Sequence, residues 1–187
     1  STPQKAVLAT AAVINGSTTM AIPVKISTTS GRAVLVYAIL DSCYICPNIL
    51  SKLGAKVSAI EPDVTINTMN GPQTVDIERY DNLTVTGYVN NNKTNISAYK
   101  RAIHCDKSNL PSPERARQFQ HLKDVANLIP PLLDIPVGLL IGMNYTEAIQ
   151  PLETRTSNKG EPFAVKTLFG WTMCGGRSST SSSSKRT

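Results

Sequence analysis

The chain contains the segment Ala38-Ile39-Leu40-Asp41-Ser42-Cys43, in which a carboxylate directly follows a long apolar run. The run begins at Ala33 and is rich in β-branched side chains, which is typical of a buried strand. Burying a carboxylate is costly unless the group is hydrogen-bonded or has a chemical role. The segment alone therefore leaves two interpretations of Asp41, a cap of the following turn and a functional acid.

The segments around this strand predict a mostly β chain. Turn sequences at Asn15-Gly16, Ser30-Gly31 and Asn70-Gly71 fit hairpins, and Asn70-Gly71 is the strongest such signal. The predicted strands cover residues 6–13, 21–26, 33–40, 64–69, 74–77, 83–89, 96–103, 137–142 and 166–173, and a hairpin-like stretch passes through 158–160. We therefore expect an all-β domain with one or two short helices.

The helical signals are few. Leu50 to Leu53 predict one helical turn that Gly54 ends. The Pro-rich stretch from Lys107 to Pro136 predicts a connector with one helix over Glu114–Ile129, because that part carries helix formers without strand alternation. Asn144–Ile149 predicts a short helix with Asn144 as its N-cap.

Composition limits the function classes. The chain has 187 residues, 41% of them hydrophobic, which suits one domain with its own core and excludes a wholly disordered chain. No apolar run is long enough to span a membrane. The net charge is +6, but the basic residues are scattered and aromatic residues are few, so nucleic acid is not an expected partner.

The ends of the chain suggest its boundaries. We expect one domain over residues 1–176 with an insertion at 107–136, followed by a flexible Ser-rich tail at 177–187. The sequence begins Ser-Thr-Pro with neither an initiator Met nor a signal pattern, so we expect a segment excised from a longer chain.

Cys43 and Cys46 form a C-x-x-C pair. A thioredoxin-like redox site would need a βαβ context, which the predicted elements do not supply. A zinc site would need two further ligands, and His104, Cys105 and Cys174 are isolated positions. We therefore expect free thiols, with no metal and no cofactor.

Four short motifs occur in an order that matches a known family. Ala38–Ser42 resembles Ala-Leu-Leu-Asp-Ser, Leu53-Gly54 a helix-closing Leu-Gly, Val137–Gly142 the strand Ile-Asp-Leu-Leu-Ile-Gly, and Thr167–Trp171 is Thr-Leu-Phe-Gly-Trp. With these motifs the chain resembles the peptidase domain of Pao/BEL-type retrotransposon polyproteins, a retropepsin-like aspartic peptidase. The resemblance runs from about Val7 to Gly176.

The resemblance implies a fold and a mechanism. The fold would be a retropepsin-like acid protease barrel with one lobe per chain, working inside the cell as a homodimer on an extended peptide or polyprotein. Two Asp41 residues, one per copy, would share a proton and activate water. Ser42 would hydrogen-bond across the dimer axis, and Ile141 and Gly142 would support the Asp41 loop from behind. The tip formed by Met69, Asn70, Gly71 and Pro72 would be a flap over the substrate.

One position departs from the family motif. The family has Gly after Asp-Ser, and this chain has Cys43, whose Cβ would crowd a tightly turning loop. The alternative prediction is therefore a catalytically inactive retropepsin fold that acts as a dimerisation or peptide-binding module.

Overall fold

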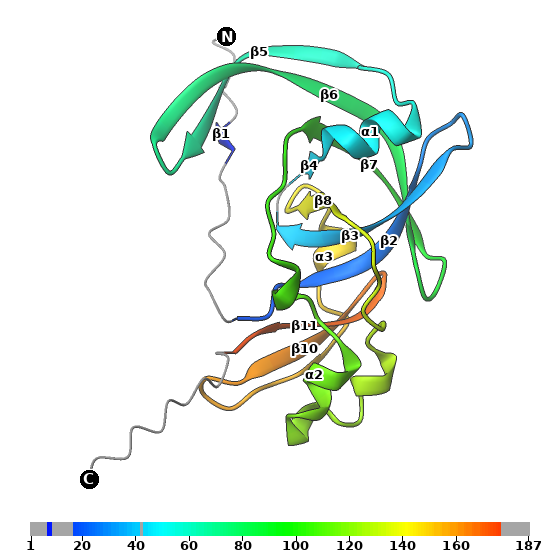
Figure 1. Cartoon of the computed structure of the whole chain (residues 1–187), viewed down its shortest axis with the longest axis vertical. Coiled ribbons are helices and arrows are strands. Elements are labelled where there is room, and N and C mark those ends of the chain that lie inside the picture. Colours follow the sequence, from blue (N-terminus) through cyan, green and yellow to red (C-terminus); the bar gives the residue numbers. More distant parts are fainter. Residues whose placement is uncertain (1–6, 9–16, 42, 177–187) are drawn as a thin grey trace.

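The computed structural model of the chain describes residues 7–8, 17–41 and 43–176 (Figure 1). The chain is mostly β, with 47% strand against 16% helix, as the sequence predicted. Four expectations lie outside the described residues: the Asn15-Gly16 turn, most of the strand over 6–13, Ser42, and the tail at 177–187.

The centre of the fold is a closed barrel of six strands. Its strands are β2 (Ala21–Ser27), β3 (Ala33–Asp41), β4 (Tyr44–Ile45), β6 (Gly71–Gly87), β7 (Lys93–Lys100) and β8 (Val137–Gly142). They follow one another in the order β6-β2-β3-β8-β4-β7, and pairing between β6 and β7 closes the ring. The interior is filled by apolar side chains from these strands, such as Ile22, Val24, Val36, Val85 and Leu139. Because β2 and β8 are buried along most of their length, they read as near-continuous apolar runs in the sequence.

Helix α1 (Pro47–Leu53) covers one part of this core. It buries Ile49, Leu50 and Leu53, and Pro47 stands in its first turn, where a missing N–H costs nothing. Gly54 ends the helix with φ 61°, a left-handed conformation that suits glycine. The predicted stop at Gly54 is confirmed, and the helix begins three residues before the predicted start at Leu50.

A long hairpin of β5 (Ala59–Thr68) and β6 extends beyond the barrel. Its turn lies at Met69 and Asn70, and Gly71 follows with φ 100°, so the predicted hairpin is confirmed. Strand β6 has 17 residues, so the two strands predicted over 74–77 and 83–89 are one. The apparent break is a bulge, because Asn82 adopts φ 57° and the register shifts between Tyr80 and Leu83. The short β1 (Val7–Leu8) pairs with the other edge of β5.

The connector at 107–136 is not one helix. It contains α2 (Pro113–Arg117) and three 3-10 turns, η1 (Lys107–Asn109), η2 (Gln120–Leu122) and η3 (Ala126–Leu128). The expectation of one helix over Glu114–Ile129 was wrong because Phe119 is extended, with φ −112° and ψ 125°, and this ends α2. The short turns instead place apolar side chains on a second sheet, which overrides their helix propensity. The buried members of this cluster are Ala116, Leu122, Val125, Ala126, Ile129, Ala164, Trp171 and Met173.

This second sheet has three strands, β9 (Glu153–Arg155), β10 (Pro162–Thr167) and β11 (Gly170–Gly175). The single strand predicted over 166–173 was wrong, because the chain turns at Leu168 and Phe169 and pairs β10 with β11. Gly170 permits this turn with φ 114°. The Thr167 hydroxyl stabilises the turn, because it accepts a hydrogen bond from Phe169 N and donates one to Gly170 O.

The last helix, α3 (Thr146–Ile149), follows β8 directly. Asn144 is not its N-cap, because Tyr145 holds that position and no side chain caps the helix. Asn144 is used in a turn that brings Tyr145 N within 3.0 Å of Gly142 O. Within the described ranges, no helix has the length and apolar character needed to cross a membrane.

Candidate functional site

Asp41 is the last residue of β3, and its neighbour on the next strand is Gly142. The two strands run parallel, with Leu40 opposite Ile141 and Asp41 opposite Gly142. Burial along β3 falls from the fully buried Ala38 to the exposed Asp41, so the carboxylate leaves the core at the strand end. Asp41 is therefore not buried, so the cost of burying a carboxylate does not apply to this residue in the single chain.

Beyond Asp41 the chain reverses beside β8. Strand β4 runs antiparallel to β8, with Tyr44 opposite Leu140, and parallel to β7. The end of β8 therefore lies between β3 and β4, the two strands that the Asp41 loop connects. Ile141 is fully buried in the barrel core, and Gly142 is buried beside the loop. Ser42, the other loop residue given a role, lies outside the described residues.

Cys43 anchors the far side of this loop. Its side chain is buried, and its sulfur accepts a hydrogen bond from Gly142 N at 3.3 Å. Its carbonyl oxygen accepts a second bond from Tyr99 N at 3.2 Å. The extra side chain relative to glycine thus fills a buried position and takes up a backbone donor. The sequence marked Cys43 as a departure but gave no sign of this partner.

The cysteine thiols have low reactivity in this setting. All four are free thiols, as expected. Burial raises the pKa of the Cys43 and Cys46 thiols, which keeps them protonated and weak as nucleophiles or metal ligands. Cys46 donates to Val137 O at 3.8 Å. Among the residues that the structure describes, His, Cys, Asp and Glu form no group of three or more that suits a metal ion.

The β5–β6 hairpin is tied to the same region by a separate apolar cluster. Val64, Ile66 and Ile77 of the hairpin pack with Tyr44 of β4, and Leu140 of β8 borders the cluster. The middle of the hairpin thus packs on β4 and β8, and Figure 1 shows the hairpin arching out past the ends of β3 and β8. At the tip, Met69 is 104% exposed, so it makes no contact with Asp41 in the single chain. The four predicted flap residues lie together at the tip, but this chain does not bring them against the acid.

Sequence reasoning missed a set of ion pairs at the base of the hairpin. Arg79 pairs with Glu61 across the two strands and with Asp81 at 3.0 Å, and Tyr99 OH donates to Glu61 at 2.9 Å. Beside them, Glu78 accepts bonds from Tyr80 OH and Lys100 Nζ, both at 2.7 Å. Burial and the bond to Glu78 raise the pKa of Tyr80 to about 12. The dense charges around Glu78–Asp81 were the one sequence feature that could have indicated these ion pairs. The pairs themselves could not be predicted, because partners such as Glu61 and Lys100 lie on other strands.

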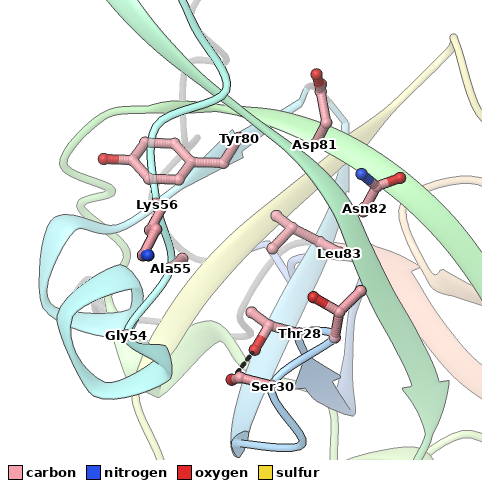
Figure 2. A pocket seen from close by; sticks show the side chains of 10 residues that line it. Thr28, Ser30, Gly54, Ala55, Lys56, Tyr80, Asp81, Asn82 and Leu83 are labelled. Atoms are coloured by element: carbon pink, nitrogen blue, oxygen red, sulfur yellow. Dashed lines mark hydrogen bonds between the residues drawn. The ribbon is translucent and has the colours of Figure 1, made fainter.

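A hollow in the described part of the chain lies elsewhere. It has a volume of about 380 Å³ and is enclosed by the β2–β3 turn, the end of α1 and the middle of β6 (Figure 2). The hydroxyls of Thr28 and Ser30 hydrogen-bond to each other at 2.7 Å on one side of it, and Tyr80, Asn82 and Leu83 line the other side. None of the predicted site residues lines it.

No family model, no curated protein and no solved structure matches this chain in the comparisons made with each.

Proposed function

We propose that this chain is one half of a retropepsin-like aspartic endopeptidase of the Pao/BEL retrotransposon type, and that two copies form the active enzyme. The observation that carries the proposal is the placement of Asp41. It is an exposed carboxylate at the end of a buried strand and is paired with Gly142. The long hairpin packs on the neighbouring strands β4 and β8. One chain has a single carboxylate at this strand end. The paired acids that the chemistry needs therefore require a second copy.

The chemistry follows from two carboxylates held close together. Like charges at short distance cannot both ionise, so the pair would share one proton. The ionised Asp41 removes a proton from water, and the water oxygen bonds to the scissile carbonyl carbon. The protonated Asp41 donates its proton to the carbonyl oxygen. Collapse of this intermediate breaks the C–N bond, and a proton passes to the leaving amine.

Cys43 favours a second candidate, an inactive retropepsin fold that binds peptides or dimerises. Its thiol already holds the Gly142 amide behind the Asp41 loop, at the position where the family motif has glycine. A loop held in this way keeps the fold and need not bring two acids within proton-sharing distance. Peptide binding through strand pairing would survive the loss of the acid chemistry.

The four free thiols fit a reducing compartment, so we place this function inside the cell. The substrate would be an extended peptide segment of a polyprotein. Neither a metal nor a cofactor takes part in the proposed chemistry.

The test is cleavage of a peptide library between pH 4 and 7, with the oligomeric state followed by analytical ultracentrifugation. The wild-type chain is expected to dimerise and to cleave. Asp41→Asn should lower the rate by about 10³-fold or more, because the variant carboxamide cannot act as the base. Asp134→Asn, which changes an equally exposed carboxylate on the connector, is the matched control and should cleave like the wild type.

The two candidates give opposite results. A folded dimer that cleaves nothing in this range contradicts the peptidase. If Cys43→Gly then gains activity that Asp41→Asn removes again, the inactive fold is supported. A chain that stays monomeric at high concentration contradicts the dimeric peptidase and the dimerisation role of the inactive fold.

A further inference from the structure

The outer edge of β5 has an occupant from the chain itself. On one side β5 pairs with β6, and on the other side its single described neighbour is β1. The pairing is parallel, with Val7 opposite Thr65 and Leu8 opposite Ile66. A sheet edge presents a row of N–H and C=O groups to which an extended peptide can add as a further strand.

The half of β5 near the hairpin tip is the part of this edge that β1 uses. Pro62 has no N–H, Asp63 has φ 54°, and the register with β6 shifts between Glu61 and Val64. These features interrupt the strand and separate the regular stretch Val64–Thr68 from the regular stretch Ala59–Glu61. Strand β1 pairs in the middle of this stretch.

The edge is also held rigid from below. Val64 and Ile66 are only 5% and 7% exposed, because they pack with Ile77 and Tyr44. A backbone fixed in the strand conformation before binding lowers the ordering cost of a docking peptide. In Figure 1, β1 lies beneath the arching hairpin, on the side toward which the arrow of β3 points.

We propose that the Val64–Thr68 edge is a docking site for an extended apolar peptide, and that the segment around Val7–Leu8 is its resident occupant, which an incoming peptide must displace. The docking stands on the strand pairing alone. Its meaning as self-inhibition rests on the proposed peptidase function, because β1 would then occupy an edge of the hairpin that the family resemblance assigns to the flap over the substrate.

The occupant is both tethered and weakly held. Thr18 is fixed by two hydrogen bonds with Gly175, at 3.1 and 2.9 Å. From there the chain to Leu8 reaches at most about 35 Å, which keeps the segment near the edge at roughly millimolar effective concentration. Only two residue pairs hold it in register. A peptide that pairs over the whole of Val64–Thr68 would therefore displace it.

Hydrogen exchange on the full chain tests the pairing directly. In the variant V7P/L8P, proline removes both N–H groups of the occupant. The amides of Val64–Thr68 that point toward β1, and not those that bond to β6, are expected to exchange at least about fivefold faster than in the wild type. The matched control S182P/S183P places the same two prolines in the Ser-rich tail and should leave this exchange unchanged. Equal exchange in V7P/L8P and the wild type overturns the proposal.

Peptide binding tests the displacement. The probe is a fluorescein-labelled peptide with the sequence of residues 5–10, Lys-Ala-Val-Leu-Ala-Thr. It should bind V7P/L8P about tenfold more tightly than the wild type and restore slow exchange at Val64–Thr68. Equal affinity for both proteins contradicts a resident occupant.

Cleavage is measured separately on the same variants. If V7P/L8P cleaves library peptides faster than the wild type, self-inhibition is supported. If it cleaves no faster than an active wild type, self-inhibition is contradicted. If no variant cleaves while exchange and binding still differ, the peptidase proposal fails and the docking proposal stands.

Discussion

The amide nitrogen of Gly142 donates a hydrogen bond to the sulfur of Cys43 at 3.3 Å, across 99 positions of the chain. Both residues are buried, so this bond satisfies a backbone donor that water does not reach. Cys43 therefore has a structural task in the loop that carries Asp41, in addition to filling space.

Removing the sulfur should destabilise the fold. Cys43→Ala leaves the Gly142 amide without its acceptor, which is expected to lower the free energy of unfolding by about 1–3 kcal/mol. Cys43→Ser keeps an acceptor at this position, so its free energy of unfolding should fall by less than that of Cys43→Ala. Urea unfolding of both variants measures the difference, with the half-buried Cys105→Ala as the control. If Cys43→Ala unfolds at the same urea concentration as the wild type, the bond contributes nothing to stability.

Gly138 should tolerate no side chain. A Cβ at this position would lie 2.7 Å from Ile49 Cγ1 and 3.0 Å from Val36 Cγ1, so α1 would be pushed away from β8. Gly138→Ala is expected to cost about 1–3 kcal/mol of unfolding free energy. Ile49→Ala removes the Cγ1 atom nearest to the new Cβ, so the double variant should lose less stability than the sum of the two single variants. Additive losses in a double-mutant cycle would show that the two positions do not compete for space.

The connector should be an integral part of the folded unit. Leu122 is fully buried between the connector and the sheet of β9–β11. Leu122→Ala is therefore expected to lower the unfolding free energy by about 2–5 kcal/mol. Leu128→Ala, six residues later and 54% exposed, is the matched control and should change it by about 0.5 kcal/mol or less. Equal effects in thermal unfolding would mean that the connector packs differently in solution.

Acid should loosen the base of the hairpin. Hydrogen bonds from Lys100 and Tyr80 lower the pKa of Glu78, and a hydrogen bond with Ser97 together with Arg79 lowers the pKa of Asp81. Both carboxylates thus have folded-state pKa values below their unfolded values. Their stabilisation is present above the unfolded pKa, about 4, and is lost as the pH falls through the folded pKa.

The melting temperature is therefore expected to fall between about pH 5 and pH 3. Glu78→Gln removes one of the two groups and should flatten this dependence. Glu147→Gln, which changes a carboxylate on α3, is the control and should keep the wild-type slope. If the melting temperature of Glu78→Gln depends on pH as it does in the wild type, the Glu78 carboxylate does not contribute to the acid destabilisation.

Local signals predicted the elements that depend on local physics. The apolar run before Asp41, the strand over 137–142, the hairpin at Asn70-Gly71 and the helix stop at Gly54 all follow from burial patterns or from glycine conformations, and all four are confirmed. The apolar run predicted Asp41 at a strand end, and the family resemblance implied Gly142 behind its loop; the structure pairs the two residues.

The remaining features depend on partners far along the chain. Nothing near Cys43 indicates that its sulfur meets Gly142, and nothing near Glu61 indicates Arg79 or Tyr99. The connector was misjudged because packing on Trp171 and Met173 favours short turns over the helix that its composition suggests. The strand break expected before Leu83 was a bulge at Asn82, since a left-handed residue can bend a strand without ending it.

The parallel pairing of β3 with β8 also has a consequence for biosynthesis. Every contact that supports Asp41 from the β8 side comes from residues about a hundred positions later, so loop closure over that distance must precede it. During translation, a nascent chain that has reached the hairpin already contains its acid but lacks the strand beside it. The proposed catalytic residue therefore stays in an unfinished setting until Gly142 has left the ribosome, which delays any self-directed cleavage until most of the domain has been made.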